Sequence, residues 1–301
     1  MINIAVLITC FNRKIKTCSC LDKLYVAINR YNSINTDKVL SVEVFLVNDG
    51  CTDGTVEAVQ TEFLDKTIHI IQGNGTLFWA GGMRLAWSEA YKNHEKWDFY
   101  LLLNDDTDVF PDAFIQLMNT HEYSIKQYGK SGIYSGATCA KDNNEVYTYG
   151  GSVWINRLKG LSKYVIPNGI PQMCDLTNAN ILLVSSNIIK QIGMFSKDYQ
   201  HGMADYDYAV RARKNDIPVL LTSFYCGACD NDHIESKILA QRICAMTLEE
   251  RKRYFKHPIH SNRDYLRFIR NISPIRLPLV WIGRMLNLYL PQFYYWLSGV
   301  R

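Results

Sequence analysis

Apolar and polar residues alternate in blocks along the N-terminal third of the chain. Short apolar runs rich in β-branched residues predict strands over Ile4–Thr9, Val42–Val47, Thr67–Ile71 and Phe99–Leu103. Segments of helical length separate these runs, for example Asp53–Phe63 and Trp79–His94. Near-continuous apolar strands that alternate with helices predict an α/β fold whose parallel sheet is covered on both faces.

Each predicted strand is followed by a polar or glycine-rich loop. These loops begin near Thr9, Asn48, Gly73 and Asn104. In open α/β sheets, ligands bind at the carboxyl ends of the strands. We therefore expect the four loops to converge on one site.

The pattern changes after Pro111. A helix is predicted over Pro111–Gln127, with proline in its first turn. Further elements are expected in chain order: strands over 133–138, 146–154 and 181–184, a helix over 205–215 and a strand over 218–223. Residues 234–301 are predicted to be helical. The simplest division is one α/β domain over 1–233, with halves 1–110 and 111–233, followed by a helical C-terminal extension over 234–301.

Composition excludes several classes of protein. With 48% hydrophobic and 21% charged residues in 301, the chain is neither disordered, collagen-like nor a small disulfide scaffold. Its nine scattered cysteines and the lack of a signal-peptide pattern favour a reducing, cytoplasmic location. The most apolar segment, 277–297, is interrupted by Pro278, Arg284 and Pro291, which favours an amphipathic or core helix over a membrane span.

The net charge of +4 conceals a division between two segments. Residues 1–233 contain 21 basic and 25 acidic residues, whereas residues 234–301 contain 12 basic and 4 acidic ones. From Tyr265 onward there are five arginines, many aromatic residues and no acidic residue. Interfacial helices share this composition, so we expect peripheral contact with the inner face of the cell membrane. A helical cap on the domain and an oligomer contact are the alternatives. Nucleic-acid binding is disfavoured because the remaining chain is acidic and no known motif occurs.

The densest acidic cluster is Asn104-Asp105-Asp106-Thr107-Asp108, directly after a predicted strand. Neighbouring carboxylates repel one another unless a cation neutralises them. Mg²⁺ and Mn²⁺ prefer oxygen ligands and often share them with substrate phosphates. A solvated turn that caps the next helix is the alternative, but the position at the ligand-binding edge favours a metal site.

Two other loops carry groups suited to a nucleotide. In Thr9-Cys10-Phe11-Asn12-Arg13, the Phe11 ring could stack on a base and Arg13 could contact phosphate. In the loop after Val47, Asp49 could accept a hydrogen bond from a base N–H or a ribose hydroxyl. Further along, Gly81-Gly82 could let the backbone approach a sugar or diphosphate closely. Taken singly, each segment is also compatible with an ordinary turn.

Taken together, the motifs resemble a known family. The order Thr-x-Phe-Asn-Arg, Asn-Asp-Gly-x-Thr-Asp-Gly-Thr and Leu-Leu-Asn-Asp-Asp is similar to the nucleotide-sugar half of the family 2 inverting glycosyltransferases. Segments 74–83 and 104–107 most resemble its rhamnosyltransferase-like branch. The resemblance covers about residues 3–235. It implies a GT-A fold, which is a Rossmann-like, mostly parallel sheet flanked by helices.

The resemblance also implies roles for single residues. The nucleoside-binding set would be Thr9, Phe11, Asn12, Arg13 and Asp49, with Gly82 beside the donor. Asp105 would approach the ribose, and Asp106 would bind a divalent ion, Mn²⁺ or Mg²⁺, that bridges the diphosphate. The usual family pattern here is Asp-x-Asp, and Asn104 occupies its first position.

A later segment, His201–Arg213, resembles the family's Glu-Asp-x-Asp followed by a helix. Ala204 stands in place of the glutamate, and Asp205 aligns with the catalytic base. Such a base takes the proton of the acceptor hydroxyl as that hydroxyl attacks the anomeric carbon. Asp207 is a second candidate for the base, and Asp205 could also cap the helix that follows.

Cys226 and Cys229, with His233 close behind, could form half of a zinc site. The other close cysteine pair, Cys18 and Cys20, has the wrong spacing to complete it. The resemblance instead implies that His233 completes the shell of the donor metal. A surface histidine without a ligand is the alternative.

The function implied is inverting, metal-dependent transfer from a nucleoside diphosphate sugar, such as dTDP-rhamnose or a UDP-sugar, to a glycan or lipid-linked acceptor in surface polysaccharide assembly. A nucleotidyltransferase is one alternative, but it normally has a glycine-rich triphosphate loop, and residues 9–13 contain no glycine. A non-catalytic protein that binds sugar nucleotides is another, kept open by Ala204. Donor hydrolysis in the presence of Mn²⁺ would distinguish them.

Overall fold

The computed structural model describes residues 1–231 and 234–300. Within them, a main sheet has the strand order β3-β2-β1-β4-β11-β6-β12-β5, and β9 pairs with β12. Its strands are β1 (Ile2–Cys10), β2 (Leu40–Asn48), β3 (Ile68–Gln72), β4 (Phe99–Leu103), β5 (Asp108–Val109), β6 (Ile133–Cys139), β9 (Gln172–Met173), β11 (Ile181–Ser185) and β12 (Val219–Ala228).

The N-terminal half of this sheet is parallel, as predicted. β1 pairs in parallel with β2 and β4, and β2 pairs in parallel with β3. β11 runs antiparallel between β4 and β6, and β12 is again parallel to β6. The sheet is therefore mostly parallel, with β11 reversed near its centre and the two-residue strands β5 and β9 reversed against β12.

Helices cover both faces of the sheet, which confirms the predicted α/β fold. The helices are α1 (Lys14–Ile34), α2 (Thr55–Glu62), α3 (Phe78–Tyr91), α4 (Ala113–Tyr128), α5 (Ser186–Ile192) and α6 (Ala204–Lys214). Alternate residues of β1 enter two separate cores because successive strand side chains point to opposite faces. Ile4 packs in the core that contains Leu21 of α1, and Leu7 packs in the core that contains Trp87 of α3.

A second, antiparallel sheet has the order β10-β7-β8, with β7 (Gly151–Asn156), β8 (Leu161–Val165) and β10 (Leu176–Thr177). The strand predicted over 146–154 was wrong in its bounds, since β7 begins only at Gly151. The preceding residues fold back onto the end of β6: Thr148 N donates to Thr138 O (3.0 Å), and Ala140 N donates to Val146 O (2.9 Å). A local hairpin with β6 therefore precedes β7.

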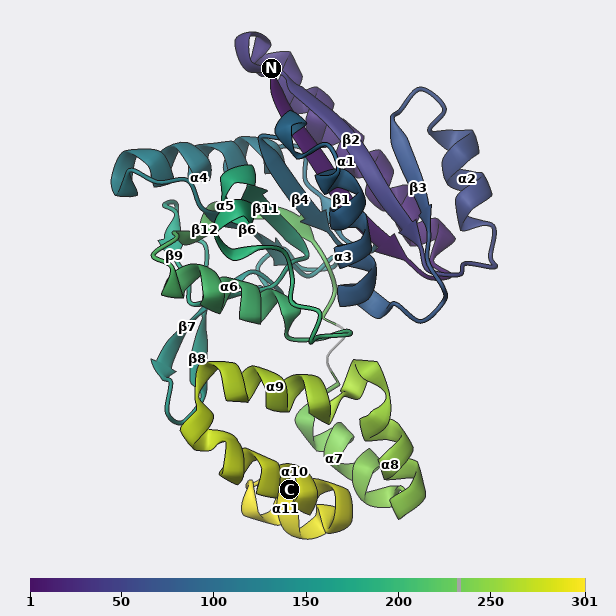
Figure 1. Cartoon of the computed structure of the whole chain (residues 1–301), viewed down its shortest axis with the longest axis vertical. Coiled ribbons are helices and arrows are strands. Elements are labelled where there is room, and N and C mark those ends of the chain that lie inside the picture. The colour runs from purple at the N-terminus through teal and green to yellow at the C-terminus, as the bar shows by residue number, and fades with distance from the viewer. Residues whose placement is uncertain (232–233, 301) are drawn as a thin grey trace.

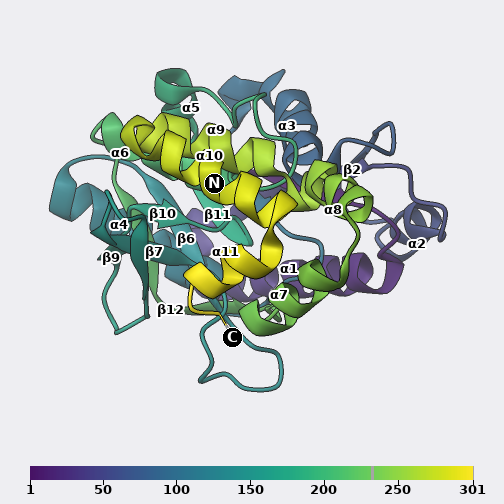
Figure 2. The same cartoon turned by 90° about the horizontal axis from the view of Figure 1, so that it is seen from below.

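The C-terminal extension is helical, as predicted, with α7 (Ser236–Ala245), α8 (Leu248–Lys256), α9 (Asn262–Ile272), α10 (Leu277–Tyr289) and α11 (Pro291–Leu297). Figure 1 shows these helices below the sheet, at the end opposite to the start of β1. Seen from below in Figure 2, α9, α10 and α11 lie in front of the sheet. No helix in the described part of the chain is long and apolar enough to cross a membrane.

α9 is packed into the domain rather than set apart from it. Its residues Phe268, Ile269 and Ile272 are each at most 5% exposed and belong to the same core as Trp87 and Tyr208. α10 and α11 leave large apolar side chains in solvent, such as Phe293, which is 47% exposed. The extension therefore has an inner helix that completes the core and an outer pair that does not.

Truncation of Phe268 should destabilise the whole domain if α9 is part of its core. We expect Phe268→Ala to lower the free energy of unfolding by about 3–5 kcal/mol, because it opens a cavity beneath α9. The control Phe293→Ala should change it by about 0.5 kcal/mol or less, since that ring is half exposed. Denaturant unfolding of both variants measures the difference, and equal effects would contradict the packing of α9 into the core.

Candidate functional site

The loops at the ends of the parallel strands are in direct contact, as the sequence predicted. Asp49 N donates to Cys10 O (3.0 Å), which joins the loops after β2 and β1. Gly73 N donates to Asn48 O (2.8 Å), which joins the loop after β3 to β2. Asn12 has a left-handed backbone (φ 51°), and its side-chain oxygen accepts from Thr52 N (2.7 Å). The loops after β1, β2 and β3 therefore form one continuous rim at this end of the sheet.

Asp49 organises the loop that leads into α3. Its Oδ1 accepts from Gly75 N (2.8 Å), and its Oδ2 accepts from Leu77 N (2.9 Å) and Phe78 N (3.1 Å). A Cβ on Gly73 would lie 2.6 Å from Asp49 Oδ1, so glycine is required there. The buried carboxylate thus fixes the 73–78 segment, while its contact with a nucleoside remains a prediction.

Gly82 has a packing role. A Cβ at this position would lie 2.1 Å from the Thr9 hydroxyl and 2.7 Å from Thr9 Cβ. Glycine at this position therefore lets α3 pack directly against Thr9, next to the last residue of β1. The predicted contacts of Thr9 and Gly82 with the donor remain open, whereas Phe11, with 55% of its surface exposed, has an accessible ring.

Arg13 joins the first loop to the acidic cluster after β4. Its Nη1 lies 3.2 Å from Asp105 Oδ1 and 2.7 Å from Asp106 Oδ2. The Thr17 hydroxyl donates to the other oxygen of Asp105 (3.3 Å). Burial raises the pKa of Asp105 to about 6, and Arg13 opposes that rise by stabilising the ionised form. One guanidinium therefore pairs with two adjacent carboxylates at the strand end and offsets only part of their charge.

The other two polar positions of the cluster have different partners. Asn104, which occupies the first position of the family's Asp-x-Asp pattern, accepts from the Trp79 indole N–H (2.7 Å). Asp108 pairs with Lys23 (2.7 Å) and Lys141 (3.2 Å). Asn104 thus ties β4 to α3, and the two lysines pair with Asp108, whereas Asp105 and Asp106 pair with Arg13.

Asp205 is connected to this cluster through the segment that contains Ala179 and Asn180. Its Oδ2 accepts from Ala179 N (3.3 Å) and its Oδ1 from Tyr206 N (2.9 Å). The next residue, Asn180, accepts from Asn104 N through its carbonyl oxygen (3.0 Å). Burial raises the pKa of Asp205 to about 6, partly offset by the backbone N–H groups that it accepts from. A single short segment therefore separates Asp205 from the acidic cluster.

Asp205 does not cap its helix, contrary to the alternative drawn from the sequence. α6 begins at Ala204, and its N-cap is Met203, in a left-handed conformation (φ 67°). Asp205 is therefore inside the first turn. Ala204 is fully buried in the core, so the family's glutamate has no counterpart at this position.

Asp207, the second candidate base, is committed to structural contacts. It is buried (3% exposed) and pairs with Arg211 Nε (2.9 Å). The Tyr199 hydroxyl donates to its Oδ1 (3.0 Å), as does Asn271 Nδ2 of α9 (3.3 Å). Of the two aspartates of α6, Asp205 is therefore the better candidate for the base, because within the described residues it has no ion pair and accepts only from backbone N–H groups.

The structure adds a residue that the sequence analysis missed. Asp264 of α9 is buried, and its Oδ2 accepts from Gln200 N (3.0 Å) and His201 N (3.2 Å). Gln200 in turn accepts from Gly81 N (3.4 Å) and donates to Thr76 O (3.3 Å). Asp264 therefore braces the segment before Asp205 against α3. The sequence did single this residue out, because Asp264 is the only acidic residue after Glu250.

The extension also contributes aromatic residues to the rim. The Phe78 ring lies edge-on to His257 (centroids 5.4 Å apart) and to His201 (6.3 Å). Burial lowers the pKa of His201 to about 4, so this imidazole is neutral at physiological pH. The rim is thus built from the α/β domain and the extension together.

The residues fit a metal ion only if a ligand shares it. In residues 1–231 and 234–300, no group of three or more His, Cys, Asp or Glu side chains could hold one. Asp106 offers one carboxylate, and Mg²⁺ or Mn²⁺ is often bound through one or two carboxylates plus substrate phosphates. The donor set therefore suits an ion shared with a diphosphate. His233, the other predicted ligand, lies outside the described residues.

The two cysteines considered for zinc have separate neighbours. Cys226 Sγ contacts the Thr222 hydroxyl (3.4 Å), whereas Cys229 Sγ lies near Asn180 Nδ2 (3.5 Å) and Asp106 Oδ1 (3.8 Å). Burial raises the pKa of both thiols to about 12. They are therefore uncharged thiols that pack at the end of β12.

Solved structures with this fold span nearly the whole chain. The mannosyltransferase PcManGT from Pyrobaculum calidifontis, in complex with GDP-Man and Mn²⁺, is 13% identical, and the match covers 97% of this chain and 71% of that one with a TM-score of 0.54. TarS 1-349 from S. aureus is 12% identical, with 99% and 92% covered and a TM-score of 0.57. Its complex with UDP-GlcNAc is also 12% identical, with the same coverage and a TM-score of 0.53.

This chain has a glycosyltransferase fold. The predicted fold class is confirmed, and at such low identity the likeness establishes the fold alone. No protein-family model and no curated protein sequence matches the chain.

Proposed function

We propose that the chain is an enzyme that transfers a sugar from a nucleoside diphosphate sugar to an acceptor hydroxyl. The observation that carries this proposal is the connection, through Ala179 and Asn180, between Asp205 and the end of β4, where Arg13 pairs with the acidic cluster. A carboxylate able to accept a proton beside a group that can bind a diphosphate supplies the two parts that such a transfer needs. Neighbours in fold that bind GDP-Man and UDP-GlcNAc support the donor class.

The finer assignment rests on the motifs. We infer membership of the family 2 inverting glycosyltransferases and their rhamnosyltransferase-like branch, with dTDP-rhamnose or a UDP-sugar as donor. The exposed Phe11 ring and the rim at Asn12 provide a place for the base. The acceptor would be a glycan or a lipid-linked glycan of surface polysaccharide assembly.

The chemical step assigns a role to each side of the site. The acceptor oxygen attacks the anomeric carbon while Asp205 takes its proton, and the bond from that carbon to the diphosphate oxygen breaks. Attack from the face opposite the leaving group inverts the anomeric centre. Arg13 offsets the charge that develops on the departing diphosphate. A divalent ion held by Asp106 would supply further neutralisation when bound.

Replacement of Asp205 tests the base. Asp205→Asn should lower the transfer rate by on the order of 10²–10⁴-fold while donor binding persists, because the amide cannot accept the proton. Wild-type transfer should also fall below about pH 6, where the Asp205 carboxyl group becomes protonated, and this fall should be weaker in the residual activity of the variant, which keeps only the titration of Asp105. Transfer kinetics across pH measure both effects.

The matched control is Asp216→Asn, which changes an exposed carboxylate just beyond α6. Its rate and pH profile should equal those of the wild type. Full activity of Asp205→Asn would rule out Asp205 as the base.

Replacement of Asp106 tests the donor-metal contact. Asp106→Ala should lower Mn²⁺-dependent donor turnover by about a hundredfold or more, a typical cost of removing a group that stabilises the developing charge. The neighbouring Asp108→Ala should retain most of the activity, since Asp108 is paired with two lysines. Equal losses in the two variants would contradict the assignment. Donor binding without turnover by the wild type would favour a non-catalytic binding protein.

A further inference from the structure

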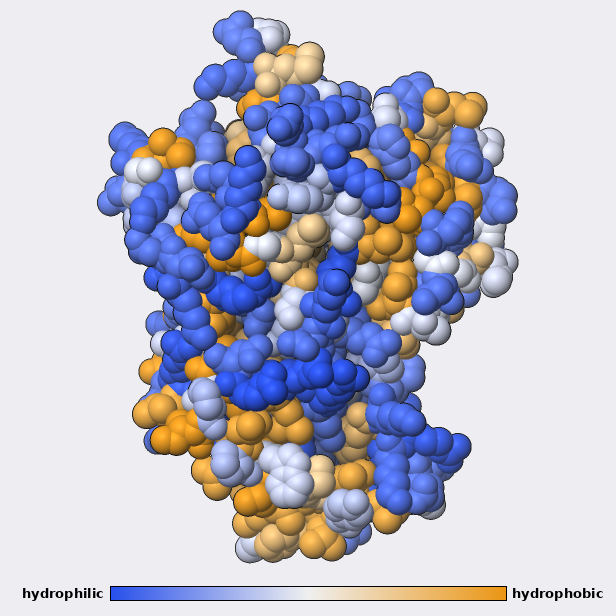
Figure 3. Space-filling view, viewed as in Figure 1, coloured by the Kyte–Doolittle hydropathy of each residue, from blue (hydrophilic) through white to orange (hydrophobic). Residues whose placement is uncertain are grey.

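An exposed apolar surface covers the outer helices of the extension. Its side chains lie on α10, on α11 and in the turn before α10: Ile275 (78% exposed), Leu279 (75%), Trp281 (52%), Tyr289 (52%), Phe293 (47%) and Trp296 (62%). Figure 3 shows apolar residues gathered at this foot of the molecule, below a band of hydrophilic residues. Soluble monomers rarely leave large contiguous apolar patches in water, so such a surface indicates a partner.

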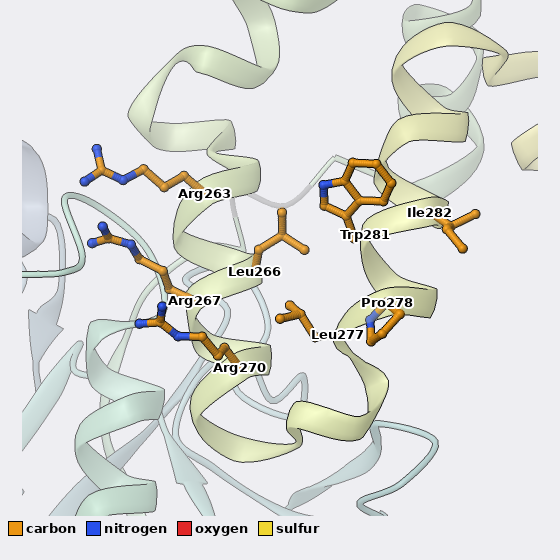
Figure 4. Close-up of a pocket in the computed structure, with 8 residues that line it drawn as sticks. All are labelled: Arg263, Leu266, Arg267, Arg270, Leu277, Pro278, Trp281 and Ile282. Carbon is orange, nitrogen blue, oxygen red and sulfur yellow. The ribbon is translucent and has the colours of Figure 1, made fainter.

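A groove runs between α9 and α10 within this surface. Its volume is about 750 Å³, and its apolar walls come from Leu266, Leu277, Pro278, Trp281 and Ile282. Figure 4 shows Leu266 and Trp281 facing each other across the groove. The groove is therefore large enough to receive an apolar chain.

Arginines border the groove along α9. Arg263, Arg267 and Arg270 follow one another at helical spacing and extend from the same side of the helix in Figure 4. Arg267 pairs with Asp198 (2.7 Å). Arg263 and Arg270 are exposed, and neither makes a hydrogen bond or ion pair with any residue that the structure describes. Two cations are thus available to a partner beside an apolar surface.

The side of α9 next to the arginine row leads to the candidate site. Asp264 holds the segment before Asp205, and Asn271 contacts Asp207. A partner on the outer side of α9 would therefore lie one helix away from the segment that precedes Asp205.

We propose that the surface formed by α9, α10 and α11 docks on a bilayer that contains anionic lipids. Its apolar and aromatic side chains enter the boundary between head groups and acyl chains, and Arg263 and Arg270 meet lipid phosphates. Charge complementarity favours this occupant, because no acidic residue occurs from Tyr265 to the end of the sequence. A second copy on a twofold axis would instead bring the same arginine row against itself.

The test is co-sedimentation of the full chain with vesicles. One set contains phosphatidylcholine alone, and the other contains equal parts of phosphatidylcholine and phosphatidylglycerol. The wild type should bind the anionic vesicles, and binding should weaken as salt rises. Leu279→Glu with Trp296→Glu should lower the partition coefficient at least tenfold. Arg263→Glu with Arg270→Glu should lower it by on the order of tenfold or more.

Matched controls separate docking from folding and from net charge. Lys126→Glu with Lys190→Glu makes the same charge change on exposed residues of α4 and α5 and should bind like the wild type. Leu64→Glu alters an apolar residue that is 83% exposed elsewhere and should also bind normally. Circular dichroism and melting temperatures confirm that each variant is folded.

The proposal is overturned if the wild type binds neither vesicle, or if the variants of the surface bind as well as the controls. A concentration-dependent dimer that the Leu279→Glu and Trp296→Glu changes abolish, without lipid binding, would identify a second copy as the occupant instead. The assay contains no sugar donor, so its failure leaves the proposed transfer reaction unaffected.

Discussion

Two consecutive carboxylates lie side by side at the end of β4 because the guanidinium of Arg13 contacts both. Asp105 is almost fully buried there, and a buried carboxylate is costly unless a cation or hydrogen-bond donor accompanies it. Arg13 can supply that charge only because β1 and β4 are neighbours in the sheet. The pairing of β1 with β4 therefore determines which charges meet at the site. A metal and a diphosphate bound here would have to share these same groups.

The strands, most helices and the convergence of the loops were predictable from the sequence. The reason is physical: apolar runs of strand length and helical segments are local patterns, and parallel strands end at one edge. The role of Asp49 was not predictable in the same way. Its two oxygens accept from three backbone N–H groups that lie 26 to 29 residues away in sequence. The reason for Gly82 is likewise a close approach to Thr9, which no local pattern records.

The contacts of the C-terminal extension were equally hard to predict from local sequence patterns. Its basic and aromatic composition was evident in the sequence, but composition does not say which side of α9 faces the domain. Phe268 and Asp264 turn inward, the first into the core and the second onto the segment before Asp205, while Arg263 and Arg270 remain outside. One helix thus serves both the core and an outer surface, and charge segregation along the chain marks only the outer part.

Ligand-dependent thermal unfolding of the wild-type chain tests the central claim most directly. The chain would be melted with dTDP-, UDP- and GDP-sugars, each with Mn²⁺ or Mg²⁺, and with the corresponding nucleosides, which lack the diphosphate. Because a ligand that binds only the folded state raises the melting temperature, at least one nucleotide sugar should raise it by about 2 °C or more in the presence of metal. The nucleosides should give a smaller shift. No shift with any nucleotide sugar would contradict the assignment of this site to a nucleoside diphosphate donor.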